Sequence, residues 1–388
     1  MFMRRSNKSV VIVTKYYYPD TSIDAISVLQ MVKGLRIRDK ELNIHIVTTD
    51  NIYKGAGKID IGNQNENIHR INSFYNGKNS FILFLSSLLD GFRLINLAKK
   101  LSIINIISLT NPPLISLWCS LLLRKFKWYY WAFDIYPDAL VASNILSKNN
   151  LLYKLINYHT YKNAPYAIIS LGERQYNFLR EKFQKDIIHT ILPCGLLKSE
   201  EELNINDIPE WYDGDRTIIG YIGNIGRGHS TNFIKEAINS IDVNTISKRY
   251  KLVLAIYGNH RVEIEEYVKN KKSLNISFVS KIDRKYLKLI DIHLVSLLKQ
   301  WTHISVPSKA VSAVLAGGMI IFEGSEQSDT WDMLRECSKR INEGDSLKEL
   351  LSSTSHDEIT KMKSNSFSIT QTLKKIEQNS YDFLLSTF

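Results

Sequence analysis

The sequence predicts an α/β protein made of two doubly wound domains in tandem. Three observations support this prediction: the length of the chain, two separate series of strand patterns, and a polar break between the two series. The 388 residues are too many for one ordinary hydrophobic core. The hydrophobic fraction of 44% and the charged fraction of 23% are typical of a globular protein.

The first series begins with Val-Val-Ile-Val-Thr at residues 10–14, a short β-branched run typical of a buried parallel strand. A polar loop and a helical pattern over residues 25–38 follow it. Strands and helices in alternation indicate a doubly wound parallel sheet. The further strands expected in this series are residues 44–48, 103–109, 128–133 and 167–170.

A polar, acidic stretch with several prolines and glycines interrupts the alternation at residues 193–215, which we interpret as a linker. A second α/β series follows it. We therefore expect a first domain over 1–200, a second over 201–368, and an amphipathic terminal helix within 369–388. The strands expected in the second series are residues 217–222, 251–257, 275–279, 292–296 and 319–322.

The net charge of +11 is unevenly distributed along the chain. Residues 1–200 hold 26 Lys+Arg and 14 Asp+Glu, whereas the remaining residues hold 24 and 25. The neutral second half argues against a nucleic-acid partner, and the basic first half suits an anionic surface or an anionic substrate. Lipid headgroups and lipid-linked pyrophosphates are both of this kind. Charge that serves solubility alone is the alternative.

Cysteine and histidine patterns give no sign of a metal or a cofactor. Cys119, Cys194 and Cys337 are far apart, and no CxxC or HExxH spacing occurs, so we expect reduced thiols, no metal and no cofactor. No run of 18 uninterrupted apolar residues marks a spanning helix. The basic start of the chain leads into a strand pattern rather than a signal sequence, so a cytoplasmic location is expected.

A glycine-rich segment runs from Gly220 to Gly228, directly after the strand expected at 217–222 and before a helical pattern. Glycine lets the backbone approach a ligand closely, and a helix N-terminus favours a phosphate group. Arg227 adds a guanidinium suited to phosphate oxygens. These features favour phosphate binding, although a tight turn that carries a surface arginine has the same pattern.

A second segment, Val306-Pro-Ser-Lys309, comes before a helical pattern that ends at Ala316-Gly-Gly318. Lys309 at the start of this helix could reach a diphosphate as a point charge, and Ser308 is the expected N-cap. His303 lies shortly before it and could line the same pocket, although a lone histidine is more often structural. A capped surface helix explains the segment equally well.

Two aspartates follow the strand expected at 128–133. Carboxylates at the carboxyl end of a strand lie where α/β sheets bind ligands, so Asp134 or Asp138 could bind ligand hydroxyls or accept a proton. A helix-capping aspartate is the alternative for either residue.

The stretch from Phe81 to Phe126 is rich in Leu, Ile and Phe and ends in Arg124-Lys-Phe-Lys127. Amphipathic helices with basic flanks can lie in a membrane interface. Ordinary core helices are the alternative. Together with the basic first half of the chain, the stretch makes peripheral membrane attachment an expectation.

The segments named above, in their order, resemble glycosyltransferase family four, and within it the enzymes of O-antigen, capsule and exopolysaccharide assembly. The resemblance covers most of the chain. Its motifs are residues 11–20, 110–114, 133–138, 191–195, 221–227, 291–296 and 306–309, the last leading to Ala316-Gly317.

The resemblance implies a GT-B fold, with two Rossmann-like domains facing each other across a cleft and the terminal helix packed on the first domain. By similarity, Arg227 and Lys309 would neutralise the leaving diphosphate of a UDP-linked sugar, and Asp134 and Asp138 would lie on the acceptor side. The other donor-side positions would be Gly223, Asn224, Gly226, Gly258, Ile282, Asp283, His303, Val306, Pro307, Ser308 and Ser312. The acceptor-side positions would be Tyr18, Pro19, Asp20, Ser22, Thr110 and Asn111.

The resemblance further implies hexosyl or N-acetylhexosaminyl transfer that is retaining and metal-independent. The acceptor would be a lipid-linked glycan of the undecaprenyl type, at the inner face of the plasma membrane. The chain departs from the family pattern at Ile304 and Ser312, where many members carry two glutamates, and at Ser22-Ile23, a frequent Gly-Gly. A non-hydrolysing nucleotide-sugar epimerase and a catalytically silent scaffold subunit are the alternatives.

Overall fold

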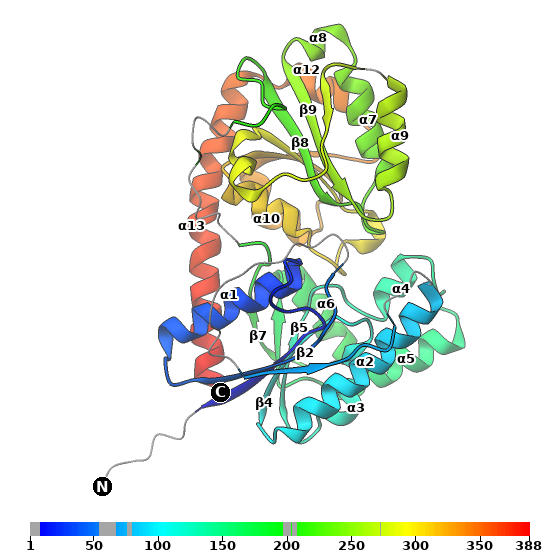
Figure 1. Cartoon of the computed structure of the whole chain (residues 1–388), viewed down its shortest axis with the longest axis vertical. Coiled ribbons are helices and arrows are strands. Elements are labelled where there is room, and N and C mark those ends of the chain that lie inside the picture. The colour runs from blue at the N-terminus through cyan, green and yellow to red at the C-terminus, as the bar shows by residue number, and fades with distance from the viewer. Residues whose placement is uncertain (1–7, 54–66, 76–79, 197–202, 204–207, 272) are drawn as a thin grey trace. The chain divides into compact units, whose positions relative to one another are not determined.

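The structure is a computed structural model that describes residues 8–53, 67–75, 80–196, 203, 208–271 and 273–388. The chain divides into two compact units, each built around one parallel sheet (Figure 1). Unit 1 comprises Met1–Cys194 and Lys375–Phe388, and unit 2 comprises Gly195–Lys374.

Unit 1 contains a seven-stranded parallel sheet in the order β3-β2-β1-β4-β5-β6-β7. The central strands are buried on both faces, which explains their continuous apolar runs. The strands are β1 (Ser9–Val13), β2 (Asn43–Thr49), β3 (Asn67–Ile71), β4 (Asn105–Leu109), β5 (Lys127–Trp131), β6 (Ala167–Ser170) and β7 (Ile188–Ile191). The helices are α1 (Ile23–Arg38), α2 (Ser80–Lys100), α3 (Ile115–Leu122), α4 (Asp138–Ala142), α5 (Leu151–Tyr161) and α6 (Glu173–Phe183).

Unit 2 contains a six-stranded parallel sheet in the order β10-β9-β8-β11-β12-β13. Its strands are β8 (Thr217–Asn224), β9 (Tyr250–Tyr257), β10 (Ile276–Phe278), β11 (Ile292–Ser296), β12 (Met319–Glu323) and β13 (Ser338–Ile341). Its helices are α7 (Thr231–Ile241), α8 (Asn244–Ser247), α9 (Arg261–Lys271), α10 (Ser308–Leu315), α11 (Asp329–Leu334) and α12 (Leu347–Ser353). Short 3-10 helices are η2 (Arg284–Leu289), η3 (Lys299–Trp301) and η4 (Arg335–Cys337).

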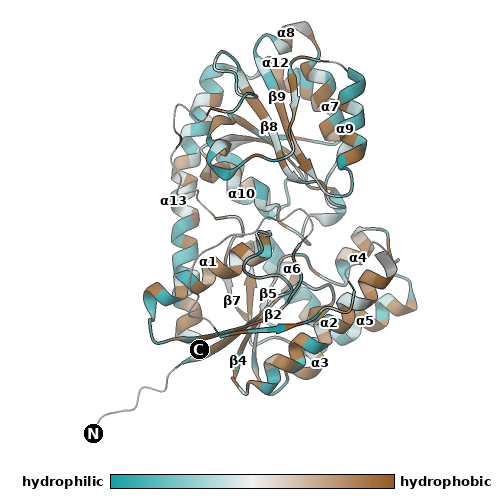
Figure 2. Cartoon of the chain, viewed as in Figure 1, coloured by the Kyte–Doolittle hydropathy of each residue, from teal (hydrophilic) through white to brown (hydrophobic). Residues whose placement is uncertain are grey.

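Helix α7 shows how the sequence builds the core of unit 2. Ser230 caps the helix, because its side chain accepts a hydrogen bond from the Phe233 amide at 3.1 Å. Phe233, Ala237 and Ile241 recur at four-residue intervals and are fully buried against the sheet. In Figure 2 the strands of both sheets carry much of the hydrophobic colour, and the helices carry both colours.

The last helix, α13 (His356–Thr387), runs through residues of both units. It begins well before residue 369, because Ser355 accepts a hydrogen bond from the Glu358 amide at 3.1 Å in a capping arrangement. Its first half pairs Lys363 with Asp291 of unit 2 at 2.5 Å, and its last turns pair Asp382 with Arg38 of unit 1 at 2.6 Å.

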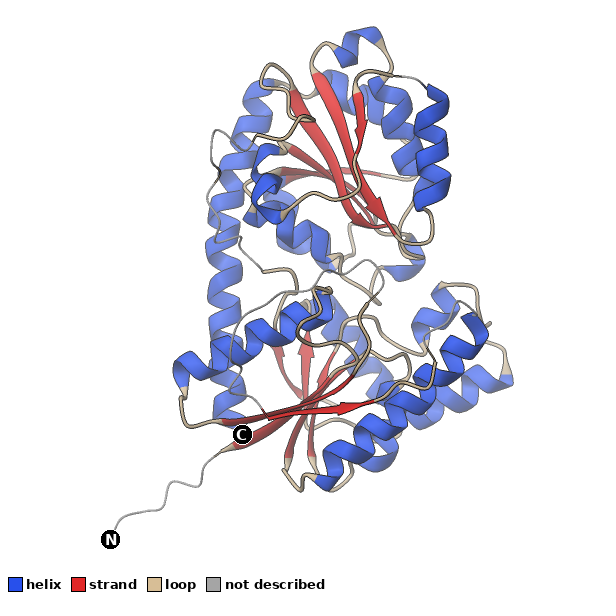
Figure 3. Ribbon diagram, in the orientation of Figure 1, coloured by secondary structure: helices blue, strands red, loops and turns tan. Residues whose placement is uncertain are grey.

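The prediction of two doubly wound α/β domains is confirmed (Figure 3). Strands β3, β7 and β13 were not predicted; each is a sheet edge, where polar residues interrupt the apolar run. Of the linker expected at 193–215, residues 197–202 and 204–207 lie outside the described residues. No helix in the described part of the chain combines the length and the hydropathy needed to cross a bilayer.

Candidate functional site

In both sheets the order of the strands reverses between the first and the fourth strand of the unit. The change falls between β1 and β4 in unit 1 and between β8 and β11 in unit 2. Helices leave such neighbouring strands toward opposite faces, which opens a crevice at their carboxyl ends, and ligands bind there. A ligand-binding site is therefore expected in the loops after these four strands.

In unit 2, the carboxyl-end edge of the sheet carries Lys309, which lies in the first turn of α10. Its ammonium donates hydrogen bonds to the Tyr221 hydroxyl and, at 2.9 Å, to the Asn224 carbonyl, and it lies 4.1 Å from the centre of the Tyr221 ring. Burial lowers the pKa of Lys309 well below its ordinary value. The lysine makes no ion pair with a described carboxylate, so its charge is uncompensated within the described part of the chain.

The glycine segment gives Lys309 this position. Gly223 has φ +132°, and a Cβ there would lie 3.8 Å from the Lys309 side chain, so the two residues are neighbours. Gly258 has φ +99°, and a Cβ there would come within 1.8 Å of the Asn224 side chain. Only glycine fits at Gly258, for both reasons. The two glycines thus keep the end of β8 close to β9 and leave the Asn224 carbonyl facing Lys309.

Arg227 lies in the loop between β8 and α7, and its side chain is exposed. The loop is anchored because the Leu298 amide donates to the Gly228 carbonyl at 2.9 Å and Gly228 packs on the Trp301 ring. Within the described ranges, the guanidinium has no hydrogen bond or ion pair. Arg227 is therefore a free cation on a fixed loop that leaves the same strand end as the Lys309 contacts.

The N-terminus of α10 differs from the prediction. Pro307, not Ser308, occupies the N-cap position, and no side chain caps the helix. The amides of Ser308 and Lys309 find no acceptor among the described residues, so they remain available to an anion. Ser312, further along the helix, donates to the Gly195 carbonyl at 3.2 Å. Ile304, the other position that departs from the family pattern, is buried.

Two residues at this edge were not predicted from the sequence. His229 Nδ1 lies 2.6 Å from the Ser296 carbonyl, so this nitrogen carries the proton; burial, helped by the charge of Lys309, lowers the pKa of His229 to about 3. Glu323 ends β12, and burial raises the pKa of its carboxyl to about 7. A hydrogen bond from Ser230 opposes that shift, so Glu323 helps to hold the start of α7. No sequence motif marks either residue; only the pairing of the strands does.

The remaining donor-side predictions divide into two groups. Gly226 and Val306 lie in the loops beside the lysine, and His303 is half-buried between η3 and α10. Ile282, by contrast, is buried in a hydrophobic cluster with Trp211 and Ile218, so its side chain belongs to the core. The Asp283 side chain is 61% exposed and pairs with Lys281 at 3.6 Å. The Asp283 side chain and the backbone of the 281–283 turn therefore stay candidates for ligand contact, and the Ile282 side chain does not.

In unit 1 the corresponding edge carries Asp24, which was not predicted. It stands in the first turn of α1 and accepts a hydrogen bond from Asn111 at 2.6 Å. Burial raises the pKa of Asp24 to about 6; the Asn111 hydrogen bond opposes the shift, and the charges of Asp134 and Asp20 add to it. Lys15, also buried, donates to Ser87 at 2.9 Å. The edge therefore holds a buried carboxyl that titrates near neutrality.

The two aspartates that follow β5 have different roles. Asp134 is half-buried and acts electrostatically on Asp24, which places it at the same edge. Asp138 is buried, and its carboxylate accepts hydrogen bonds from Tyr153 at 3.1 Å, Tyr161 at 2.8 Å and Lys182. These contacts tie α4 to α5 and α6. They correct the expectation of a catalytic Asp138, since both carboxylate oxygens are engaged inside unit 1.

The other acceptor-side predictions are mainly structural. Asp20 accepts hydrogen bonds from the Ser22 and Tyr53 amides, and Ser22 caps α1. The Tyr18 carbonyl, next to Pro19, accepts from Arg70, and Thr110 accepts from the Phe133 amide at 3.2 Å. These residues shape the loops around Asp24, and Asn111 alone among them contacts it.

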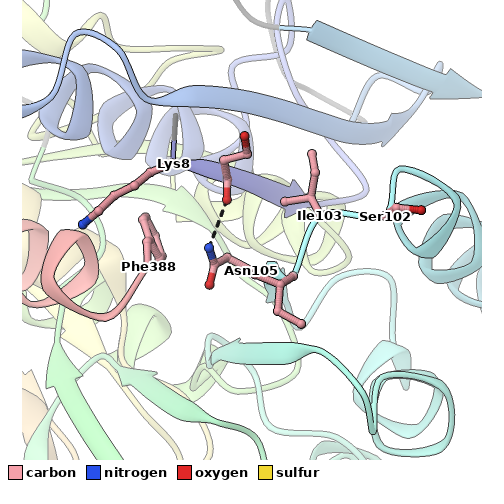
Figure 4. A pocket seen from close by; sticks show the side chains of 7 residues that line it. Lys8, Ser102, Ile103, Asn105 and Phe388 are labelled. Atoms are coloured by element: carbon pink, nitrogen blue, oxygen red, sulfur yellow. Dashed lines mark hydrogen bonds between the residues drawn. The ribbon is translucent and has the colours of Figure 1, made fainter. Parts of the chain in front are cut away.

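Unit 1 also has a hollow at the opposite edge of its sheet (Figure 4). It is lined by Lys8 and Ser9 at the start of β1, by the loop before β4, and by Phe388. Asn105 closes it by donating to the Ser9 carbonyl at 3.0 Å. It lies at the amino ends of the strands, so it is not part of the candidate site.

Comparisons with known proteins point to one fold. No family model matches the sequence. "Probable glycosyltransferase WbjE" of Pseudomonas aeruginosa is 23% identical over 233 residues, and the match spans 56% of this chain and 56% of that protein. The match therefore covers about half the length of that curated relative.

Solved structures match over nearly the whole chain. A sucrose-phosphate synthase from Thermosynechococcus elongatus superposes with a TM-score of 0.68 at 15% identity, covering 98% of this chain and 100% of that one. HepE from Anabaena, solved in complex with UDP and glucose, gives a TM-score of 0.61 at 11% identity, covering 97% and 99%. The chain therefore has the GT-B fold, and the proteins it resembles in sequence and in structure include glycosyltransferases.

Proposed function

We propose that the protein is a glycosyltransferase that moves a sugar from a nucleotide-sugar donor to a lipid-linked glycan. Unit 2 holds the donor and unit 1 holds the acceptor. The main observation behind the proposal is the Lys309 ammonium, which has no described carboxylate partner and lies beside two free helix amides. These groups lie where the strand order of unit 2 reverses, between β8 and β11. The GT-B fold and the WbjE match support it.

A diphosphate is the leaving group that this site fits. Lys309, the amides of Ser308 and Lys309, and the exposed Arg227 supply positive charge and hydrogen-bond donors from two chain segments, the start of α10 and the loop after β8. Charge that develops on the leaving oxygen would be stabilised by groups already in position, which is usually the largest contribution to catalysis. The UDP complex of HepE supports a UDP-linked donor. The sugar would be a hexose or an N-acetylhexosamine, transferred with retention of configuration.

On the acceptor side, Asp24 and Asp134 can orient the attacking hydroxyl. Asp24 is ionised only above a pH of about 6, so it can also share a proton with that hydroxyl near neutral pH. In a retaining transfer, an oxygen of the departing phosphate would take the proton from the attacking hydroxyl. The residues of this chain then position the two reactants without forming a covalent intermediate.

A nucleotide-binding subunit without transferase activity is the second candidate. Ser312 and Ile304 occupy the positions of the two usual glutamates, and Ser312 is engaged with the Gly195 carbonyl. A nucleotide donor could then bind although the chain lacks these two glutamates.

One experiment separates these functions. The purified protein is incubated with a panel of nucleotide-sugars, with and without a bacterial lipid extract, and the products are analysed by mass spectrometry. Transfer predicts a lipid product heavier by one sugar, formed only when both reactants are present. A new nucleotide-sugar without acceptor would instead indicate an epimerase, and nucleotide binding without turnover a binding subunit.

A further inference from the structure

Helix α2 carries apolar side chains on the face that points away from its unit. Ile82, Leu85, Leu89 and Phe92 follow one another at three- and four-residue intervals, so they form one stripe along the helix. Leu89 is 47% exposed and Ile82 is 44% exposed. The opposite side of the helix is the one that packs on β1 and β2. The stripe therefore remains in solvent after folding.

Helices α3 and α5 extend this stripe into a broad surface. Trp118 of α3 packs edge-on against Phe92 at 5.1 Å and donates to the Leu88 carbonyl at 2.9 Å. Helix α3 in turn contacts α5, whose Leu151, Leu155 and Tyr158 point outward. The three helices lie side by side in Figure 1, and we call their outer surface the α2–α3–α5 face. Exposed apolar surfaces of this extent mark interaction sites.

Within residues 80–162, which form the α2–α3–α5 face, the exposed charges have one sign. The acidic residues between positions 80 and 162 are Asp90, Asp134 and Asp138, and none of them is exposed. The exposed basic residues of the same segment are Lys100, Arg124, Lys125, Lys148, Lys154 and Lys162. A partner that covers this face has to offer apolar contact and negative charge together.

We propose that the α2–α3–α5 face binds the surface of a bilayer that contains anionic lipids. The leucine and phenylalanine side chains would enter the acyl boundary, and the lysines and arginines would meet the headgroups. A second copy of the chain fits poorly, because a twofold contact would place the same basic residues against one another without an exposed carboxylate to pair with. The inference rests on the proposed function, since a lipid-linked acceptor is reached at such a surface.

The test is flotation of the full-length protein with vesicles of phosphatidylcholine alone or with about one-third phosphatidylglycerol, a composition that gives an anionic surface. The wild type should float with the anionic vesicles and lose binding at high salt. The pair Leu89→Ser with Leu155→Ser should lower the bound-to-free ratio by roughly tenfold. The matched control is Ile37→Ser with Leu274→Ser, at positions 78% and 94% exposed outside the face; this pair should bind like the wild type.

Three results would overturn the inference: no binding of the wild type to anionic vesicles, equal loss in the control pair, or a wild-type dimer that the Leu89→Ser and Leu155→Ser pair dissociates while vesicle binding persists. UDP affinity is measured on the same samples by calorimetry. Retained UDP binding with failed flotation rejects the membrane surface alone, whereas loss of UDP binding in the wild type rejects the donor site.

Discussion

The ammonium of Lys309 lies over the ring of Tyr221, 4.1 Å from its centre, and pairs with no carboxylate in the described part of the chain. A partly buried, uncompensated cation is unfavourable unless it has a ligand of opposite charge. Free amides at the start of α10 adjoin it, and the exposed Arg227 stands on the loop that follows β8. This arrangement is complementary to a diphosphate, and it leads to the following predictions.

Replacing Lys309 by methionine should lower turnover of the donor by roughly 10²–10³, the usual loss when one stabilising donor is removed from a leaving group. The fold should persist, because the Tyr221 hydroxyl can still donate to the Asn224 carbonyl, which lies 3.3 Å away. Steady-state kinetics and thermal unfolding measure the two effects. Lys269→Met is the control, since this lysine is 71% exposed and should affect neither. A large loss of stability without loss of turnover would contradict the assignment.

Binding of UDP should be linked to proton uptake. Burial lowers the pKa of Lys309 in the free protein, and a bound diphosphate stabilises the ammonium form and raises that pKa again. UDP affinity should therefore fall as the pH rises through the pKa of the free protein. Calorimetry in buffers of different ionisation enthalpy measures the protons taken up, and Lys309→Met should abolish the uptake. Equal uptake by the two proteins would show that another group titrates.

Arg227→Ala should lower kcat/KM by roughly 10²-fold or more with little change in stability, because the side chain is exposed and unpaired within the described residues. Arg227→Lys should recover part of the activity, since it restores the charge but not the planar fork. Arg261→Ala, which removes an exposed arginine paired with Glu265, serves as the control. Equal activity of Arg227→Ala and the control would exclude Arg227 from the site.

Asp24→Asn should change both the pH profile and the stability. The pKa of Asp24 is raised to about 6, so the folded protein binds this proton more tightly than the unfolded chain does. Its contribution to stability is present below a pH of about 4 and is lost as the pH rises through 6. The stability of the variant relative to the wild type should therefore rise by roughly 2–4 kcal/mol as the pH increases from about 4 to above 6, measured by denaturant unfolding. We expect wild-type kcat/KM to rise as Asp24 ionises near pH 6 and the variant to lack this rise. A rise that persists in the variant would rule Asp24 out.

Asp138→Asn should act on the fold and not on the chemistry. The substitution weakens the pair between the buried Asp138 and the half-buried Lys182, and losing a hydrogen bond to a charged group typically costs about 1.5–3 kcal/mol. Denaturant unfolding measures that loss. Activity per folded molecule should stay at the wild-type level, in contrast to Asp24→Asn. A fall in kcat for fully folded Asp138→Asn would restore the catalytic role first expected of this residue.

The two doubly wound α/β domains could be predicted from the sequence because the central strands carry uninterrupted β-branched runs, such as residues 10–13. The sequence also proposed Arg227 and Lys309, since a glycine turn and a helix start mark their positions, and their role in binding stays a prediction. It pointed to Asp138 and missed Asp24. Both residues lie in the first turn of a helix that follows a strand. Only the tertiary contacts show that the Asp138 carboxylate accepts hydrogen bonds from two tyrosines and a lysine, whereas Asp24 accepts one from Asn111.

His229 and Glu323 were not predicted either, because their environments also depend on tertiary contacts. Their surroundings come from the pairing of β11 with β12 and from the start of α7, which are distant in sequence. The edge strands were missed because a strand with one neighbour tolerates polar residues and loses the apolar pattern.

Titration of UDP into the wild type and into the double variant Arg227→Ala with Lys309→Met tests the donor site most directly. We expect the wild type to bind UDP and the double variant to bind it at least about 100-fold more weakly, with its fold intact by circular dichroism. Equal affinity of the two folded proteins would contradict this expectation.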